Sequence, residues 1–259
     1  LTLIITTYNW PEALYLVIES IKKQTIIPDE IIVADDGSSS ETKKLIDDVK
    51  KDSAINLIHS WQEDIGFRAA RSRNLAILKS SGDYIITIDG DTILHRSFIR
   101  DHLLNAEIGF FIQGTRVMLT RLQTMKSLTQ TNTNFSFFSK GLHNRKNSIH
   151  SDRLSKIFST KKNNINGIKS CNMSFYRQDF YNVNGFNNDF EGWGREDSEF
   201  IVRLMNSGIK RKNIRFNALQ FHLWHKENNK LSILKNDQIL KLAINKNTKW
   251  CSNGINSIE

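Results

Sequence analysis

The chain has 259 residues, enough for one large domain or two small fused ones around a buried core. Hydrophobic residues make up 39% and charged residues 24%, as is typical of a soluble globular protein. No apolar run approaches the roughly 18–20 residues of a membrane-spanning helix. The first residues read as a strand and not as a signal peptide, and Cys171 and Cys251 are too few for a disulfide framework. We therefore expect a cytoplasmic protein.

The net charge of +9 favours a polyanionic partner such as nucleic acid, an anionic membrane or a phosphorylated substrate. The excess is concentrated in residues 140–169, where Asp152 is the one acid. Two interpretations stay open for this stretch. It is a solvated, mobile loop, or it is a patch that faces an acidic acceptor or the surface of an anionic membrane.

Strand and helix patterns alternate up to residue 91. Short apolar runs predict buried strands at residues 1–6, 31–33, 55–58 and 84–88. Helices are predicted from Pro11, from a capping box of Ser38 and Glu41 to about Lys51, and over residues 67–78. This rhythm is typical of a mainly parallel sheet.

After residue 91 the alternation ends. Helices are predicted at residues 97–105, 197–206 and 231–244, and strands at 110–119, with an interruption near Gly114, and at 170–176. Residues 120–169 are polar and weakly periodic, and no element is placed there.

Three polar clusters follow predicted strands: residues 6–9, 35–36 and 89–91. Because ligands of such sheets bind beyond the carboxyl ends of the strands, we expect the three to meet in one crevice. Asp89 and Asp91 flank a glycine that permits a sharp turn, and two close carboxylates repel each other unless a cation lies near. Their hard oxygen ligands suit Mg²⁺ or Mn²⁺ bound to a diphosphate.

Two further motifs lie in the second half. In GWGRED at residues 192–197, two glycines bracket Trp193, which could stack on the apolar face of a sugar ring. The two acids that follow also suit the start of a helix. His222 and His225 are three residues apart; such a pair is often structural, but beside a pair of aspartates it becomes a candidate for metal binding.

These motifs together resemble family 2 glycosyltransferases. The residues that carry the resemblance are TTYN at 6–9, VADDGS at 33–38, QEDIGFR at 62–68, RSRN at 71–74 and DGD at 89–91. GWGRED at 192–197 and HLWH at 222–225 resemble the C-terminal part of animal β-1,4-galactosyltransferases and bacterial chondroitin polymerases.

The resemblance implies a GT-A fold, a Rossmann-like αβα sandwich with a mainly parallel central sheet and a smaller acceptor-side region. Residues 1–95 would form the nucleotide-sugar-binding half, 96–225 the acceptor-binding and catalytic half, and 226–259 a helical tail. It also implies a set of residues that bind the nucleotide sugar: Thr6, Tyr8, Asp35, Asp36, Arg68, Arg73, Asp89 and Asp91. Thr6, Arg73 and either Asp35 or Asp36 would hold the uridine.

The resemblance also implies a metal site and a catalytic pair. Asp91 and His225 would bind the metal, with Asp89 and His222 as further candidates, although the galactosyltransferases carry a methionine where His222 stands. Mn²⁺ is favoured over Mg²⁺ because imidazole is a ligand.

Asp197 matches the catalytic base, and its place at the start of a helix predicts that it is ionised at neutral pH. Glu196 would act beside it, and the acceptor sugar would contact Trp193, Gly194, Arg195 and Glu196. Arg195 departs from the glycine of the animal enzymes and could contact a negative group. A retaining family that glycosylates polypeptides carries a similar pattern.

The sequence thus predicts an inverting, metal-dependent transferase that moves a hexose or N-acetylhexosamine, with galactose or N-acetylgalactosamine favoured, from a UDP-sugar to a sugar hydroxyl. The expected acceptor is a glycan or lipid-linked glycan of a bacterial surface, such as lipooligosaccharide or capsule, met at the cytoplasmic face of the membrane. The alternatives are a nucleotidyltransferase acting on sugar phosphates and a non-catalytic polyanion-binding protein. Nucleic acid is not the expected partner, because no nucleic-acid-binding module is recognisable.

Overall fold

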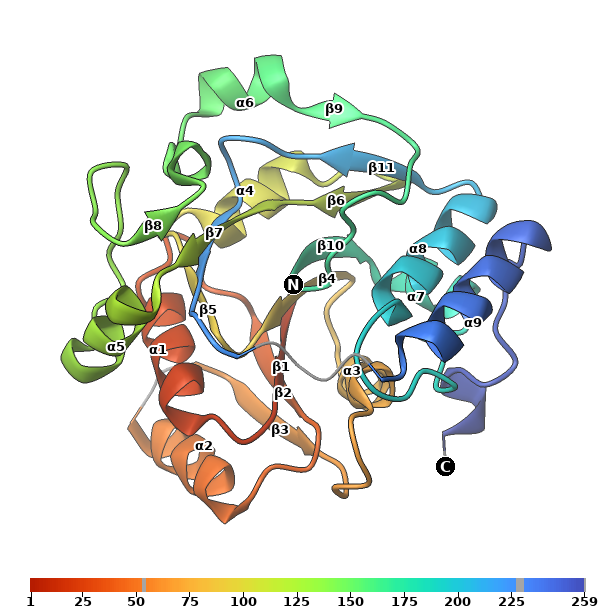
Figure 1. The fold of residues 1–259 in the computed structure, drawn as a ribbon, viewed down its shortest axis with the longest axis horizontal. Coiled ribbons are helices and arrows are strands. Elements are labelled where there is room, and N and C mark those ends of the chain that lie inside the picture. Colours follow the sequence, from red (N-terminus) through yellow and green to blue (C-terminus); the bar gives the residue numbers. More distant parts are fainter. Residues whose placement is uncertain (53–54, 227–230, 259) are drawn as a thin grey trace.

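The computed structural model describes residues 1–52, 55–226 and 231–258, which form an α/β fold built on two sheets (Figure 1). The large sheet has the order β3-β2-β1-β4-β10-β6-β11-β9. Its strands are β1 (Thr2–Thr7), β2 (Glu30–Asp35), β3 (Leu57–Trp61), β4 (Tyr84–Asp89), β6 (Phe110–Gln113), β9 (Thr160–Lys161), β10 (Asn172–Tyr176) and β11 (Lys210–Asn213). The small sheet has the order β5-β12-β7-β8, with β5 (Thr92–Leu94), β7 (Thr115–Leu119), β8 (Leu142–His143) and β12 (Leu219–His222).

Helices cover both faces of the large sheet because β1 alternates its side chains between two cores. Leu3 and Ile5 pack with apolar residues of α1 (Pro11–Lys22), α2 (Ser40–Asp52) and α4 (Phe98–Asn105). Ile4 packs on the other side with residues of α3 (Ala69–Leu78), α7 (Arg177–Asn182) and α8 (Glu196–Asn206). The predicted α/β sandwich is confirmed in this arrangement.

The parallel strands β3, β2, β1 and β4 bring the predicted polar clusters to one edge. Thr7 lies opposite Asp35, and Thr6 lies opposite Asp89 in the ladder. The parallel order ends at β4, since β10 runs antiparallel to both β4 and β6. The large sheet is therefore mixed, with the expected parallel arrangement in its N-terminal half.

The predicted strand at 110–119 is two strands in two sheets, divided at Gly114. A Cβ at Gly114 would lie 2.2 Å from Asn172 Oδ1, so a side chain there would collide with β10. Beyond this crossing, β7 and β5 pair with β12 on either side. That pairing sets His222 opposite Thr92, directly after the Asp89-Gly90-Asp91 turn.

Two other expectations differ in detail. Ser38 does not open a helix as predicted: its hydroxyl accepts a hydrogen bond from the Asn9 amide, and α2 begins at Ser40. The polar region 120–169, where no element was predicted, contains α5 (Arg121–Gln130), β8, η1 (Arg145–Ser148), α6 (Asp152–Phe158) and β9. Weak periodicity concealed these elements because they are short and pack against other elements on few residues.

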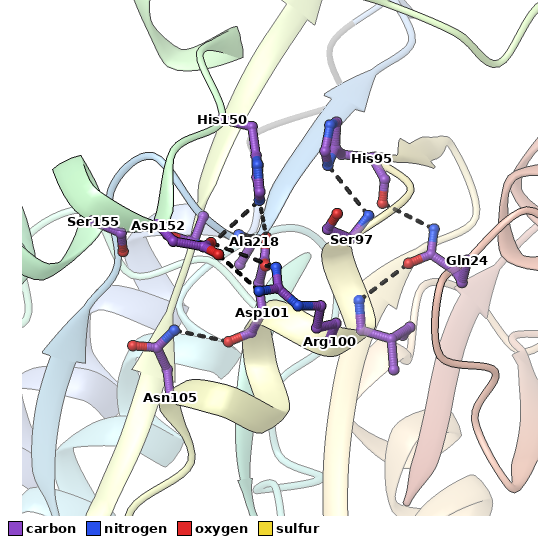
Figure 2. Close-up of polar contacts among 12 residues, drawn as sticks. Gln24, His95, Ser97, Arg100, Asp101, Asn105, His150, Asp152, Ser155 and Ala218 are labelled. Carbon is purple, nitrogen blue, oxygen red and sulfur yellow. Dashed lines mark hydrogen bonds and ion pairs between the residues drawn. The ribbon is translucent and has the colours of Figure 1, made fainter.

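The basic stretch 140–169 is attached to α4 through a buried carboxylate. Asp101 Oδ2 lies 2.9 Å from His150 Nε2 and accepts a hydrogen bond of 2.9 Å from the Ala218 amide (Figure 2). Arg100, the neighbour of Asp101, pairs with Asp152 at 2.7 Å and lowers the pKa of Asp152 to about 2. Whether the stretch is mobile stays a prediction, but these contacts anchor its middle.

The described part of the C-terminal segment packs onto the body of the fold. Residues of α9 (Ile233–Asn245) contact Val202 of α8, and Ile255 in η2 (Ile255–Ser257) joins the core beside α3. Residues 227–230 and 259 of the predicted tail lie outside the described residues. The expected division at residues 95 and 225 stays a prediction.

Replacing His150 by alanine should loosen the contact between the basic stretch and Asp101. We expect amide exchange in α6 to become about tenfold faster, since a hydrogen bond to a charged group contributes about 1.5–3 kcal/mol. Hydrogen–deuterium exchange measured by mass spectrometry checks this. His143→Ala, an exposed change in the same stretch, is the control and should leave α6 unaffected; equal exchange in both variants would contradict the anchoring.

Candidate active site

Backbone hydrogen bonds join the end of β1 to the loops that follow β2 and β4. The Gly90 amide donates to the carbonyl of Thr6 at 2.7 Å, and the Asp36 amide donates to the carbonyl of Thr7 at 3.0 Å. A Cβ at Gly90 would lie 2.9 Å from Thr7 Oγ1, which explains why a glycine separates the two aspartates. The three polar clusters thus meet at one edge, as the sequence predicted.

Arg73 of α3 connects these loops to the start of α8. Its Nε donates to Thr6 Oγ1 at 3.0 Å, its Nη1 donates to Glu196 Oε1 at 3.2 Å, and its Nη2 lies 3.5 Å from Asp89 Oδ1. Only 4% of Arg73 is exposed. Burial disfavours this cation, but the surrounding carboxylates outweigh it and raise the pKa of Arg73.

The two aspartates after β2 have different partners. Asp35 is fully buried; its Oδ1 accepts from the Ser38 amide at 2.8 Å and its Oδ2 lies 2.8 Å from His59 Nε2. Asp36 accepts hydrogen bonds from Gln62 Nε2 and from the Arg68 amide, and burial raises its pKa. Both carboxylates therefore shape the turn itself.

Tyr8 and Arg68 both contact the loop that follows β3. Tyr8 is 49% exposed, and its hydroxyl donates to Asp64 Oδ2 at 3.0 Å. The Arg68 guanidinium donates to the carbonyl of Glu63. An exposed aromatic ring beside two loops offers a face on which a flat base could stack.

Asp91, His222 and His225 form a group in which one ligand atom from each residue lies within 4.8 Å of the others. Asp91 Oδ1 lies 3.5 Å from His222 Nε2, and Asp91 Oδ2 lies 3.3 Å from His225 Nε2. Asp91 Oδ1 and His222 Nδ1 are buried and form no hydrogen bond within the described residues. Buried polar atoms without partners are rare, and the unpaired Asp91 Oδ1, which faces His222 Nε2, is available to a cation in this group.

Asp89 stands apart from that group. Burial and the Asp91 carboxylate raise its pKa, although Arg73 opposes them. A bound cation would relieve the repulsion between the two carboxylates. The donor set of one carboxylate and two imidazoles can hold a divalent transition metal and suits Mg²⁺ less well, because Mg²⁺ prefers oxygen ligands.

A second group of potential ligands consists of His95, Asp101 and His150 (Figure 2). Here the carboxylate already has protein partners: Asp101 accepts from the Ala218 amide and lies beside His150 and Arg100. The His95 ring accepts a hydrogen bond from the Ser97 amide. This group therefore fits the anchoring of the basic stretch better than metal binding.

Asp197 lies in the first turn of α8. Its Oδ2 accepts from the Ser170 amide at 3.1 Å, and its Oδ1 accepts from the Ser198 amide at 2.6 Å. Burial and the adjacent Glu196 carboxylate raise the pKa of Asp197 to about 7, against the opposing effect of Arg73. The sequence predicted that the helix start biases Asp197 toward the ionised form; burial and Glu196 oppose this bias, so that Asp197 titrates close to neutral pH with a pKa of about 7.

The loop that precedes α8 is held by α9. Gly192 and Gly194 have φ angles of 73° and 105°, and a Cβ at Gly192 would lie 2.2 Å from Ser232 Oγ. Asn236 Nδ2 donates to the carbonyl of Gly194 at 2.9 Å. Trp193, between the two glycines, is 41% exposed. The loop is thus fixed in a left-handed conformation that glycine favours, with the indole at the surface.

Arg195, predicted to contact the acceptor, is paired with an aspartate of α9; a contact with the acceptor stays a prediction. Arg195 Nε donates to Asp237 Oδ1 of α9 at 2.6 Å, and its backbone is left-handed with φ 77°. No local pattern predicts this pairing, because Asp237 is 42 residues away along the chain. The hydrogen bonds of Gln62 with Asp36, of Tyr8 with Asp64 and of Asn236 with the Gly194 carbonyl were not predicted either. Each of them joins residues that are far apart in the sequence.

The chain resembles known proteins in sequence and in fold. Residues 153–226 match the N-terminal domain of galactosyltransferase. Over 234 residues the chain is 26% identical to hyaluronan synthase of Pasteurella multocida, covering 83% of this chain and 24% of that protein. Over 246 residues it is 24% identical to chondroitin synthase of Escherichia coli, covering 86% of this chain and 34% of that protein.

A third relative is the O-antigen chain rhamnosyltransferase RfbN of Salmonella typhimurium, 41% identical over 99 residues, which are 36% of this chain and 29% of that protein. The chain thus spans about a quarter to a third of these curated relatives. A crystal structure of Staphylococcus aureus TarS residues 1–349 in complex with UDP superposes with a TM-score of 0.62 at 12% identity, over 93% of this chain and 64% of that chain.

The superposition and the mixed α/β architecture define a glycosyltransferase fold of the GT-A type. Residues 2–182, most of the chain, match glycosyl transferase family 2, and the protein belongs to that family. The fold predicted from the sequence is thereby confirmed.

Removing a ligand of the Asp91, His222 and His225 group should weaken metal binding. We expect Asp91→Asn to abolish Mn²⁺-dependent binding of UDP, and His225→Ala and His222→Ala each to weaken Mn²⁺ affinity by at least roughly 10–100-fold. Titration calorimetry with Mn²⁺ and UDP measures this, and His143→Ala is the control. Unchanged Mn²⁺ affinity in both histidine variants would make the pair structural.

Proposed function

We propose that this family 2 glycosyltransferase moves a hexose or N-acetylhexosamine from a UDP-sugar to a sugar hydroxyl of a surface glycan, with inversion. Three kinds of likeness support this proposal: relatives named for hyaluronan, chondroitin and O-antigen synthesis, a fold shared with a protein crystallised with UDP, and the galactosyltransferase match at residues 153–226. The last of these favours galactose or N-acetylgalactosamine as the transferred sugar.

The observation that carries the proposal is that one buried cation joins the two halves of the site. Arg73 contacts Asp89, two residues before Asp91 of the candidate metal group, and Glu196, the neighbour of Asp197. A donor diphosphate held at the metal group and an acceptor hydroxyl held at Asp197 would therefore meet across a short distance, as a displacement requires.

Asp91, His222 and His225 are the residues that would hold a divalent metal, with Mn²⁺ favoured and Asp89 close by. Such an ion, when bound, offsets the charge that develops on the departing diphosphate. Thr6, Tyr8, Asp35, Asp36, Arg68 and Arg73 would shape the nucleotide side. Tyr8 has the most exposed side chain of these residues, whereas Arg73 and Asp35 are buried. Arg73 and Asp35 would therefore contribute by holding the surrounding loops in place.

Asp197 would accept the proton of the acceptor hydroxyl while the acceptor oxygen forms its bond to the anomeric carbon. The bond from that carbon to the diphosphate oxygen breaks on the opposite face, so the configuration inverts. Trp193 and Gly194 would border the acceptor, and Glu196 keeps Arg73 in place beneath it. Arg195 pairs with Asp237, so we assign it to holding the acceptor loop.

The two alternatives from the sequence gain no support. Neither a nucleotidyltransferase acting on sugar phosphates nor a non-catalytic polyanion-binding protein accounts for the family 2 match over residues 2–182. Within the described residues, the longest helices are too short and too polar to cross a lipid bilayer. Action at the cytoplasmic face of a membrane, with the basic stretch against anionic lipid, stays part of the proposal.

A donor screen tests the proposal directly. Incubation with UDP-Gal, UDP-GalNAc, UDP-Glc and UDP-GlcNAc should release UDP slowly, without acceptor, from the true donor and only with a divalent metal. Release of pyrophosphate in place of UDP, or no metal-dependent release from any donor, would reject the proposed reaction.

Asp197→Asn keeps the shape of the side chain but removes the proton acceptor. We expect kcat to fall by roughly 10²–10⁴-fold while UDP and Mn²⁺ affinities stay nearly unchanged. Steady-state kinetics and calorimetry with an active acceptor check both parts. Near-normal kcat in Asp197→Asn would exclude this residue as the base, and a product that retains the donor's anomeric configuration would exclude inversion.

The raised pKa of Asp197 predicts a pH dependence of transfer. Because this pKa is about 7 and only the ionised carboxylate accepts a proton, kcat should rise with pH up to about 7 and level off above it. Glu196→Gln removes one of the charges that raise this pKa, so the apparent pKa of the remaining activity should move down. A flat profile between about pH 5.5 and 8.5, or an upward shift in Glu196→Gln, would contradict the assignment.

A further inference from the structure

A cavity of about 510 Å³ lies beside the candidate active site. It is bordered by the chain crossing at Gly114, the start of β7, the end of β11 and the loop that leads into β10. Its volume falls within the range of about 300–1,000 Å³ that is typical of small-molecule sites. None of the residues proposed above to bind the nucleotide sugar lines it.

The charge of this cavity is one-sided. Arg116, Lys169, Arg211 and Arg215 line it, and no aspartate or glutamate is among the described residues that do so. We call it the basic cavity. Amide side chains, including Asn144 and Asn213, complete the lining and suit sugar hydroxyls. Cations gathered in a concave site without a counter-charge favour a bound anion.

Two buried polar atoms in this lining have no partner within the described residues: Arg211 Nε and Thr115 Oγ1. Arg211 is 5% exposed, and its Nη1 donates to the carbonyls of Asn164 and Asn166, both at 2.7 Å. The guanidinium is thus fixed by one nitrogen while another stays available. The hydrogen bond of the Arg116 guanidinium is a weak one, to the Cys171 thiol at 3.7 Å.

One wall of the basic cavity is fixed by side-chain hydrogen bonds. Gln113 Nε2 donates to the carbonyl of Lys169 at 3.0 Å, and the Lys169 amide donates to Gln113 Oε1 at 3.0 Å. Asn172 Nδ2 donates to the carbonyl of Thr115 at 2.8 Å. A site formed before the ligand arrives loses less entropy when it binds.

The same wall is hydrogen-bonded to Asp197, the proposed base. Lys169 and Cys171 line the basic cavity, and the amide of Ser170 between them donates to Asp197 Oδ2 at 3.1 Å. Burial and the nearby carboxylates Asp89 and Asp91 raise the pKa of the Cys171 thiol to about 12, which is consistent with the closeness of the metal group. The backbone between two residues of the cavity wall thus contacts the proposed base, which places the cavity next to Asp197.

We propose that the basic cavity is an acceptor subsite for a saccharide or polyol unit that carries a carboxylate or a phosphate, bound by Arg116, Arg211 and Arg215 while its hydroxyl-bearing neighbour reaches Asp197. This inference rests on the glycosyl transfer proposed above and adds the class of acceptor. Both anions offer oxygen atoms that a guanidinium binds through charge-assisted hydrogen bonds.

Binding is tested with short probes on the full chain: a glucuronic-acid-containing disaccharide, its neutral glucose counterpart and a glycerol phosphate dimer. NMR or calorimetric titration should show that at least one anionic probe binds about tenfold or more tightly than the neutral one, with an affinity that falls as salt rises. Whichever anion binds more tightly identifies the source of the charge.

Arg116→Gln and Arg215→Gln should each weaken binding of the anionic probe by about tenfold and raise the acceptor KM, without changing the weak binding of the neutral one. Lys210→Gln removes an exposed charge from the same strand β11 outside the cavity and is the matched control, with expected changes below about twofold. Arg215 is exposed, so its replacement keeps the test valid if Arg116→Gln fails to fold.

Equal affinity for charged and neutral probes, or arginine variants that bind as the wild type does, would overturn the acceptor subsite. The donor screen separates this outcome from failure of the proposed function. Metal-dependent release of UDP without any preference for anionic probes would reject the subsite alone. Selective anion binding that depends on Arg116 and Arg215, without release of UDP from any donor, would support the anion site and reject the transfer reaction.

Discussion

The arrangement of the site depends on one buried cation, Arg73. A guanidinium that is 4% exposed is costly to bury unless anions and acceptors surround it, and Thr6, Asp89 and Glu196 meet that need. These partners come from β1, from the end of β4 and from α8. The same contacts that compensate its burial therefore tie the parallel half of the sheet to the helix that carries Asp197.

The second constraint is the crossing of the chain between two sheets at Gly114. It sends residues 110–113 into the large sheet and residues 115–119 into the small one, where β7 and β5 pair on either side of β12. The pairing of β12 with β5 brings His222 beside Asp91. The same crossing, together with Gln113 and Asn172, forms one wall of the basic cavity. The candidate metal group and the cavity thus both depend on the passage of the chain from one sheet to the other.

The loop proposed to border the acceptor depends on contacts with residues late in the chain. Asn236 and Asp237 of α9 hold the carbonyl of Gly194 and the side chain of Arg195. This helix also packs on α8 through Leu240 and Ala243. Glycines that favour a left-handed backbone would otherwise leave the Trp193 loop with many conformations. The C-terminal segment is therefore an integral part of the site.

The sequence by itself determined the α/β sandwich, the edge where three loops meet, and the residue types of the site. It could do so because strand alternation, the turn at Gly90 and the spacing of His222 and His225 are local patterns. Only the tertiary structure decided which partners those residues have. Arg195 pairs with Asp237, Asp101 anchors His150, and burial beside Glu196 raises the pKa of Asp197, because each effect joins groups from separate elements or depends on exclusion of water. The basic cavity had no local signal either, since its four cations, scattered from residue 116 to residue 215, come together only when β7, β11 and the loop before β10 are folded.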